Sequence, residues 1–399
     1  MPDSTLPDPP ARRWLNRTVV GIGLASLCSD WSHEIATAVL PAFLATMGAA
    51  AAWLGFIEGT ADGLASFTKL ASGFYSDRLP RRKPLAVTGY ILTALGTASL
   101  GLAASAWQVL AARSAAWLGR GVRTPVRKAL LAAAVTRESY GRAFGFERMM
   151  DTLGAIIGPL TALVLLQLLR HDYARIFTLT VIPGLAAAAL MAFAVQERGR
   201  AIVVRERFSA SLRALPPRFR RLLVAVGLFG LGDCAHTLLI LLAVQQLTPV
   251  YGATGAVTAA TGLYILHNVL YAAFSMVAGA VADRMNKGRL LALGYALAGA
   301  MALVIVLMPL GLWALALIFV LGGVSVAVCE TAEDSYCAEL VEDSQHGTAF
   351  GTLATVNGVG DFASSLIVGA LWAAFGAPIA FAYSALLFLA GGLMVLRSS

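Results

Sequence analysis

The sequence is dominated by apolar runs of about 20 residues, each long enough to cross a bilayer as a helix. Charged residues make up only 13% of the chain, and its mean hydropathy is +0.75, whereas soluble proteins carry about 25% charged residues. These values exclude a soluble enzyme, a nucleic-acid-binding module and a secreted disulfide scaffold. No disulfide framework is expected from the four cysteines, which lie in or beside apolar segments: Cys28, Cys234, Cys329 and Cys337. We therefore predict a polytopic, all-α membrane protein.

Hydropathy predicts twelve transmembrane helices in two groups of six. The first group is 19–47, 51–74, 84–103, 107–131, 145–169 and 176–195, and the second is 222–247, 257–282, 290–308, 312–330, 349–374 and 378–396. A charged segment with eight arginines separates them. We expect a cytosolic tail at 1–18, a six-helix bundle at 19–195, a cytosolic linker at 196–221 and a second six-helix bundle at 222–396.

The positions of the thirty Lys and Arg residues predict the orientation of the chain. If the N-terminus is cytosolic, all but Lys69, Arg113, Arg170 and Arg175 fall in cytosolic segments or at the cytosolic ends of spans. This bias predicts that both termini are cytosolic, and it accounts for the net charge of +8 without nucleic acid. Compact loops and the lack of a targeting segment favour a bacterial inner (plasma) membrane.

The two predicted halves repeat each other in the same direction. The segments 73–78 and 141–145 return as 279–284 and 347–351, both at an offset of 206, and Asp-x-x-His at 30–33 returns at 233–236. Parallel repeats of six spans, with a site between them at mid-membrane, are a transporter architecture.

The loop between the second and third spans matches the signature G-x-x-x-D-[RK]-x-G-[RK]-[RK], and the chain resembles the major facilitator superfamily over nearly its whole length. The matching residues are Gly73, Asp77, Arg78, Arg81 and Arg82, with Pro80 in place of the second glycine; the second-half copy keeps Gly279, Asp283 and Arg284. A glycine permits close helix approach, and a buried aspartate requires a partner such as arginine. The resemblance implies that this motif latches the cytosolic gate and does not bind substrate.

The fifth span contains Gly154, Gly158 and Pro159, with Ala162 four residues after Gly158. This resembles the family's antiporter motif G-x-x-x-G-P-x-x-G, with alanine in place of the last glycine, which implies export by exchange. The alternative is a helix-packing face, because small residues four apart let two helices approach closely.

Charged residues at the bilayer centre cost about 2.5–3.5 kcal/mol each on insertion scales, so such residues face a cavity or a partner. The resemblance implies that spans 1, 2, 4, 5, 7, 8, 10 and 11 line a central cavity. The charged and polar residues that these spans carry form the candidate substrate and proton cavity: Asp30, His33, Glu34, Glu58, Asp62, Arg113, Asp151, Asp233, His236, Tyr264, His267, Asn268 and Asp361.

Acids outnumber bases among these residues, with only Lys69 and Arg113 as fixed cations at this depth. Burial favours the protonated form of a carboxyl group, and a carboxyl group that gains and loses a proton is what proton coupling requires. We expect Asp30, Glu34 or Asp62 to carry the coupling proton. The alternative is that each acid has a structural partner, such as Lys69 for Asp62 or Arg113 for Glu58.

The repeated Asp-x-x-His suggests a second function. Asp30 and His33, with Asp233 and His236, could approach the axis between the halves, and carboxylate and imidazole suit transition metals. This composition resembles the ferroportin-like branch of the superfamily. The alternative is that the histidines bond to neighbouring carboxylates as gating or proton-relay partners.

The cytosolic ends of the fourth and tenth spans carry opposite charges. We expect Arg123 or Arg127 to meet Glu330, Glu333 or Asp334 when the halves close on the cytosolic side. The alternative is that both ends are solvated loops that follow the positive-inside bias.

No phosphate loop, nucleophile elbow or complete catalytic constellation is present, so we expect no enzyme activity and no cofactor. The leading prediction is a monomeric, proton-coupled secondary transporter that works by alternating access and exports a small cationic or amphipathic organic compound. Its expected partners are the bilayer, protons and the substrate, and not nucleic acid. The alternatives are a transition-metal transporter and a non-transporting receptor or scaffold on the same fold, which would have little reason to keep charges inside the membrane.

Overall fold

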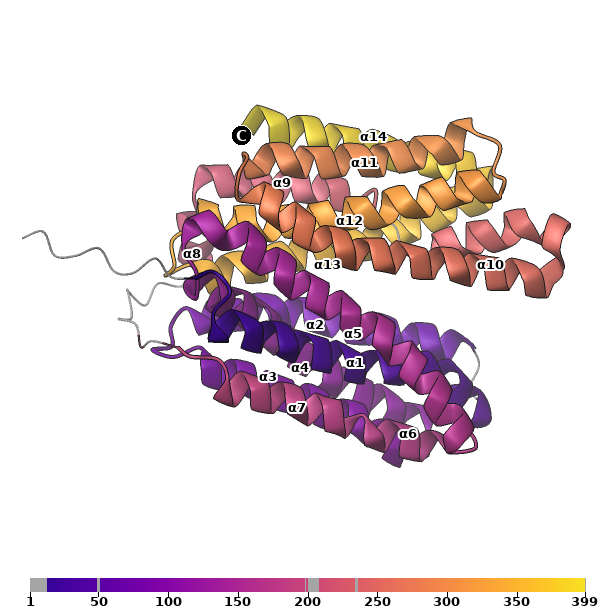
Figure 1. The fold of residues 1–399 in the computed structure, drawn as a ribbon, viewed down its shortest axis with the longest axis horizontal. Coiled ribbons are helices and arrows are strands. Elements are labelled where there is room, and N and C mark those ends of the chain that lie inside the picture. The colour runs from indigo at the N-terminus through magenta and orange to yellow at the C-terminus, as the bar shows by residue number, and fades with distance from the viewer. Residues whose placement is uncertain (1–12, 49–50, 198, 200–207, 234–235, 399) are drawn as a thin grey trace, which may run out of the picture.

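The computed structural model describes residues 13–48, 51–197, 199, 208–233 and 236–398, in which every element of secondary structure is a helix. One group of helices comprises α1 (Arg17–Thr46), α2 (Ala51–Ser76), α3 (Lys83–Ser99), α4 (Ala106–Ala133), α5 (Tyr140–Leu168), α6 (Tyr173–Leu179) and α7 (Val181–Phe193). The short α8 (Phe208–Ala214) precedes a second group of α9 (Pro217–Gly230), α10 (His236–Ala282), α11 (Lys287–Leu307), α12 (Leu312–Leu340), α13 (His346–Phe375) and α14 (Ala377–Ser398). Figure 1 shows the two groups side by side.

Local sequence explains where several helices begin and turn. Asn16 accepts hydrogen bonds from the N–H groups of Thr18 and Val19, at 2.9 and 3.1 Å, and so caps the start of α1. Gly252 has a φ of 69°, in the left-handed region that favours glycine, and divides α10 into two helical segments. Figure 1 shows the chain turning back there, at the end far from the C-terminus.

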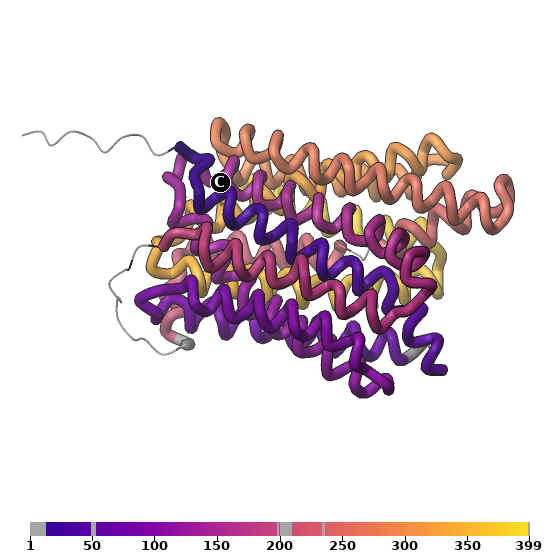
Figure 2. Tube along the Cα trace, turned by 60° about the horizontal axis from the view of Figure 1, so that its bottom comes forward, coloured from indigo at the N-terminus to yellow at the C-terminus, as the bar shows by residue number. Residues whose placement is uncertain are grey.

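Both ends of the helical chain lie at the same end of the molecule. Figures 1 and 2 show the start of α1 and the C-terminus at the same end of the molecule. We call this end the termini face and the end with Gly252 the opposite face. The helix expected over 222–247 is not continuous, because α9 ends at Gly230 and α10 begins at His236. Asp233 lies outside both helices, near the weak helix formers Gly230 and Gly232.

Among the described residues, eight helical segments are long and apolar enough to cross a membrane. They are Lys83–Leu102, Arg137–Leu168, Tyr173–Phe193, His236–Ala282, Lys287–Leu307, Leu312–Leu340, His346–Phe375 and Ala377–Arg397. The helices α1, α2 and α4 are not among them, and these are the helices that carry several of the buried charges described below. The expected count of twelve spans therefore remains a prediction.

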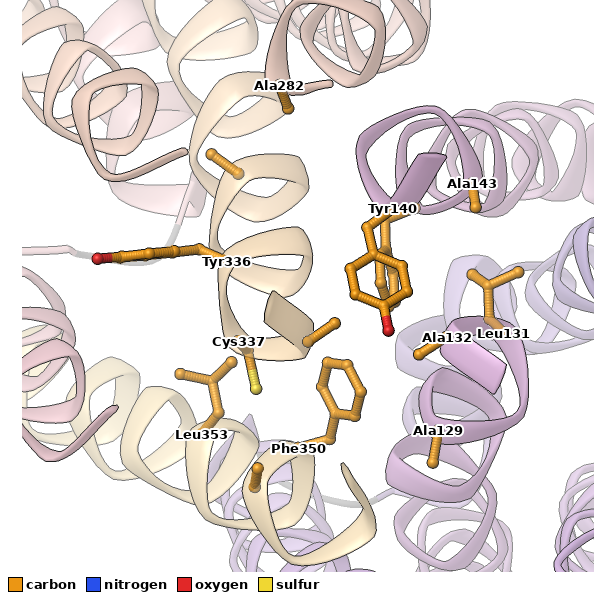
Figure 3. Packing of buried hydrophobic residues seen from close by; sticks show 14 of the residues in the cluster. Ala129, Leu131, Ala132, Tyr140, Ala143, Ala282, Tyr336, Cys337, Phe350 and Leu353 are labelled. Carbon is orange, nitrogen blue, oxygen red and sulfur yellow. The ribbon is translucent and has the colours of Figure 1, made fainter. Parts of the chain in front are cut away.

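The apolar core joins the two groups of helices only near the termini face. One cluster of buried side chains there contains residues of both groups, with the rings of Phe144 and Phe350 5.6 Å apart. Figure 3 shows Tyr140 and Phe350 in the space between the two groups. Toward the opposite face, each group has its own cluster, around Leu40 and Phe177 in one and around Leu242 and Phe319 in the other. The two halves are thus packed together at one end and separate at the other.

Candidate functional site

Two helix pairs bring the groups into close contact at the termini face. A Cβ atom on Gly73 of α2 would lie 2.2 Å from the carbonyl oxygen of Gly347 in α13. A Cβ atom on Gly141 of α5 would lie 2.3 Å from that of Gly279 in α10. These glycines let the backbones touch, which larger residues would prevent. Both pairs involve the repeated segments of the sequence, so the two contacts are related by the approximate two-fold axis between the halves.

At each of these contacts, an aspartate of one half accepts hydrogen bonds from the start of a helix in the other half. Asp77 accepts hydrogen bonds from the N–H groups of Gly347 and Thr348 at 2.9 and 2.6 Å, and from Arg82 at 2.5 Å. The carboxylate therefore stabilises the start of α13, where unpaired N–H groups favour negative charge. Arg82 also donates to the carbonyl oxygen of Asp343, in the same second group of helices.

The second-half copy of the motif makes the same contacts, with its aspartate in the second half and the capped helix in the first half. Asp283 accepts from the N–H groups of Gly141 and Arg142 at the start of α5, at 2.7 and 3.2 Å, and from Arg142 Nε at 2.6 Å. Each half therefore caps a helix of the other half.

The remaining basic residues of the motif lie around this contact. The Arg78 guanidinium lies 3.7 Å from the centre of the Phe74 ring, and Arg81 lines an open surface cavity with Lys83 and Glu197. Arg284 is exposed. None of these three arginines forms an ion pair between the groups of helices among the described residues.

Direct ion pairs between the halves lie just inside this contact. Lys128 of α4 lies 2.6 Å from Asp334 of α12, and Arg148 of α5 lies 2.7 Å from Glu330 and 3.5 Å from Asp334. Tyr271 also donates a hydrogen bond to Glu330. The acids expected at the gate are therefore present, but the basic partners are Lys128 and Arg148.

The expected gate arginines pair inside the first half instead. Arg127 lies 2.8 Å from Glu147 and 3.3 Å from Asp151, and Arg123 lies 3.6 Å from Asp30. The reason is helical phase, since residues four apart share a face and Lys128 is turned by about 100° from Arg127. The expectation that Arg123 or Arg127 reaches α12 is wrong.

The first half neutralises most of its buried acids. Asp30 lies 3.4 Å from Arg120 as well as beside Arg123, so Lys69 and Arg113 are not the only cations at this depth. Arg113 pairs with Glu58 at 3.0 Å and donates to the Thr37 hydroxyl at 3.1 Å. Asp30 is thus ion-paired in this structure, as expected of an acid with a structural partner.

Four acids of the predicted cavity have no ion pair within the described part of the chain: Glu34, Asp62, Asp233 and Asp361. Asp62 of α2 and Asp361 of α13 are exposed. Both carboxyl groups interact electrostatically with the Lys69 ammonium group, although neither forms an ion pair with it. Nothing lies within 4 Å of a Cβ atom on Gly59 or Gly63 of α2 or on Gly369 of α13, so these segments are open beyond the contact. We call this uncovered region of α2 and α13 the open part, and the exposed carboxyl groups of Asp62 and Asp361 belong to it.

The polar residues of α10 form a separate cluster in the second half. His267 is buried, with its ring 4.8 Å from that of His236 and 6.0 Å from that of Tyr264. Asn268 donates to the carbonyl oxygen of Tyr264 at 3.0 Å. In the first half, the ring of His33 lies 5.2 Å from Trp117.

The two Asp-x-x-His pairs do not combine into a metal site. Among the described residues there is no group of three or more His, Cys, Asp or Glu side chains placed to hold a metal ion. Asp30 is instead held by two guanidinium groups, which compete with a cation for its oxygens. Cys234, which directly follows Asp233, lies outside the described residues.

Gly154 and Gly158 of α5 face α1. A Cβ atom on Gly154 would lie 2.4 Å from the carbonyl oxygen of Leu27, and one on Gly158 would lie 2.5 Å from Glu34 Cβ. Pro159 follows within the helix. These small residues hold the two helices together inside one half.

Sequence reasoning missed Lys128 and Arg148 as gate residues. A signal for Lys128 exists, because Lys128 and Asp334 are separated by the repeat offset of 206 and carry opposite charges. Residues related by a two-fold axis meet when they lie close to that axis. No comparable signal identifies Arg148.

Comparisons with known proteins agree with this geometry. The family described as the Major Facilitator Superfamily matches residues 22–310 and 233–398. An uncharacterised MFS-type transporter of Methanocaldococcus jannaschii is 26% identical over 384 residues, covering 96% of this chain and 95% of that protein. Multidrug resistance protein MdtH of Salmonella paratyphi B is 33% identical over 118 residues, 29% of each chain.

Solved structures of the same fold extend over the whole chain. The human organic anion transporter MFSD10 superposes with a TM-score of 0.76 at 16% identity, covering 97% of this chain and 100% of that one. The Escherichia coli fucose:proton symporter FucP superposes with a TM-score of 0.75 at 17% identity, covering 96% and 99%. At these identities the likeness concerns the fold.

Proposed function

The chain belongs to the Major Facilitator Superfamily, and from this premise we propose that it is a proton-coupled secondary transporter that exports a small cationic or amphipathic organic compound. We propose that its helices cross the inner (plasma) membrane twelve times as two parallel six-helix repeats. The termini face is then cytosolic. The chain works as a monomer, with the bilayer, protons and substrate as partners, and uses the proton gradient without a cofactor.

The observation that carries this proposal is the difference between the two ends of the molecule. At the termini face, Asp77 and Asp283 cap helices of the opposite half, and Lys128 pairs with Asp334. Toward the opposite face, the halves have separate cores, and the α2 positions Gly59 and Gly63 are open. This is the arrangement expected of one of the two end states of alternating access, closed to the cytosol and open outward.

The charge of the open part supports a cationic substrate. Asp62 and Asp361 are exposed, and the nearby Lys69 is half-buried, with its backbone against Gly351 of α13. Two carboxylates facing one ammonium group leave a net negative charge, which attracts a cation. The similar protein MdtH is a multidrug resistance protein and the structurally similar FucP is a fucose:proton symporter, which supports an organic substrate and proton coupling for this chain.

The experiment is gradient-driven transport by purified chain in proteoliposomes, with ethidium as the probe. An acidic lumen should drive ethidium inward in exchange for protons. Asp62→Asn and Asp361→Asn should lose this gradient-driven component, because each removes a carboxylate from the open part. Asp172→Asn is the matched control, since asparagine also caps a helix and Asp172 lies at the exposed start of α6.

Two results would contradict the proposal. Ethidium movement equal to that in protein-free liposomes, repeated with other organic cations, would exclude the substrate class. Movement that is independent of the pH gradient would exclude proton coupling. Equal losses in all three variants would indicate general damage in place of a role for the two cavity acids.

A further inference from the structure

The buried carboxyl groups of the helices are nearly all neutralised by a cation. Asp30, Glu147, Asp151 and Asp334 are each buried and each lie within 3.6 Å of an arginine or lysine nitrogen. Glu333 of α12 differs, although its residue is only 7% exposed. Among the described residues, no ion pair includes Glu333.

The groups that face Glu333 leave it without a free cation. Asn357 of α13 donates to its Oε1 at 2.6 Å. The nearest cation is Lys128 of α4, whose ammonium group is already 2.6 Å from Asp334, and Arg148 is held by Glu330 and Asp334. The other neighbours are neutral or acidic: the Tyr295 hydroxyl of α11, the Cys329 thiol of α12 and Asp233.

A buried carboxylate with one amide donor and no cation is costly, whereas the protonated acid is neutral. Asp334, the next residue, already holds a buried negative charge. A second charge beside it would add repulsion that Lys128 and Arg148 cannot offset, since their charges serve Glu330 and Asp334. The neutral form of Glu333 is therefore the form that this closed arrangement accommodates.

We propose that Glu333 carries the coupling proton and releases it when the termini face opens; this rests on the proposed function of the chain as a proton-coupled transporter. Lys128 and Arg148 leave α12 when the halves separate, and water then reaches Glu333. The carboxylic acid transfers its proton to water, giving a carboxylate and a hydronium ion on the termini side. The exported cation then compensates the carboxylate while the termini face recloses. After that cation leaves toward the opposite face, Glu333 takes up a proton from that side, so each cycle moves one proton toward the termini side in exchange for one cation.

Glu333 differs from the acids that the sequence favoured for this role. Asp30 is ion-paired with two arginines, Asp62 is exposed, and Glu34 is half-buried against Gly158 of α5. Glu333 is buried beside the ion pairs that hold the halves together. Its protonation can therefore change the stability of the gate directly, as coupling demands.

The first test measures protonation in the purified, full-length chain by infrared difference spectroscopy, without substrate. A protonated carboxyl group gives a carbonyl band separate from that of a carboxylate. We expect such a band at neutral pH, and we expect Glu333→Gln to lower its intensity by the contribution of one carboxyl group. The control is Glu330→Gln, one turn of α12 away, which should leave the band unchanged because Glu330 is paired with Arg148. A band of unchanged intensity in Glu333→Gln overturns the proposal.

The second test links the proton to the gate. Spin labels at Thr136 and Glu342, which line one cavity of the termini face from the two halves, report the distance across it. In the chain without native cysteines, raising the pH should lengthen this distance, because deprotonation of Glu333 destabilises the closed state. Glu333→Gln should stay closed at every pH, while Glu333→Asp, which still titrates, should respond and shows that the site tolerates substitution.

The outcomes separate this inference from the proposed function. A wild-type pH response in Glu333→Gln overturns the role of Glu333. Loss of the pH response in this variant while it still exchanges ethidium for protons also overturns that role. A Glu333-dependent band and pH response, in a chain that moves no organic cation against a proton gradient, supports the protonation site and overturns the transport proposal.

Discussion

The cap that Asp77 places on α13 gives the sharpest quantitative prediction. Asp77→Asn keeps the size of the side chain but removes its charge. Asparagine offers one acceptor oxygen, so one of the two hydrogen bonds from Gly347 and Thr348 is lost, together with the ion pair to Arg82. We expect the open state of the termini face to gain population.

The magnitude follows from these contacts. Hydrogen bonds to charged groups contribute about 1.5–3 kcal/mol, and negative charge at a helix N-terminus adds about 0.3–1 kcal/mol. Loss of one such bond and of the charge therefore costs the closed state about 2–4 kcal/mol. At 1.4 kcal/mol for each factor of ten, the ratio of open to closed molecules should rise roughly 30-fold to 700-fold.

The matched variant is Asp283→Asn, which makes the same change in the second half. Its arginine partner, Arg142, has a side chain that is 37% exposed, against 3% for Arg82, so water screens the second ion pair more strongly. We expect a smaller shift for Asp283→Asn than for Asp77→Asn.

Distances between spin labels at Thr136 and Glu342 measure the two populations. The two caps lie on different helix pairs, so the double variant should show the sum of the two free-energy changes. An unchanged distance distribution in Asp77→Asn would refute the view that this carboxylate stabilises the closed state.

Three further predictions concern particular contacts. Lys128→Asp and Asp334→Lys should each open the termini face, and the double exchange should restore the closed distance; failure to restore it would show that the pair does not hold the gate. Gly154→Ala should lower stability by about 1–3 kcal/mol through its clash with Leu27, while Gly63→Ala in open space should raise it by about 0.5–1 kcal/mol, and equal changes in thermal unfolding would contradict this. Arg113→Gln should cost about 3 kcal/mol by leaving Glu58 unpaired, and adding Glu58→Gln should recover part of that loss in the same assay.

The repeat in the sequence predicted the largest features of the site. Gly73 and Asp77 were placed beside a gate by the signature, and the structure puts them against Gly347, a residue of the second repeated segment. Because the repeat pairs Asp77 with Asp283, one cap implies the other. These features depend on glycine spacing and on charge, both of which are visible in the sequence.

The helical phase of single side chains was not predictable in the same way. Hydropathy places Arg127 and Lys128 on the same turn of α4 but does not say which of them faces α12. That depends on how α4 packs against α1 and α5, where Glu147 binds Arg127. The break before His236 was missed for a related reason, because an apolar run continues across Gly230 and Gly232 while the helix does not.

The distribution of charge between the halves connects these observations. After residue 221, the sequence has only four basic residues, Arg284, Lys287, Arg289 and Arg397, and none lies in the apolar part of a helix. Glu330 and Asp334 of α12 are therefore paired with cations of the first half, Lys128 and Arg148. When the halves part at the termini face, those cations leave and the acids of α12 must be solvated. Asp233 and Asp361 have no ion pair among the described residues, and the proposed function assigns their compensation to a cationic substrate or a proton. Under that proposal, the unequal distribution of charge between two otherwise similar halves couples opening of the gate to binding of positive charge.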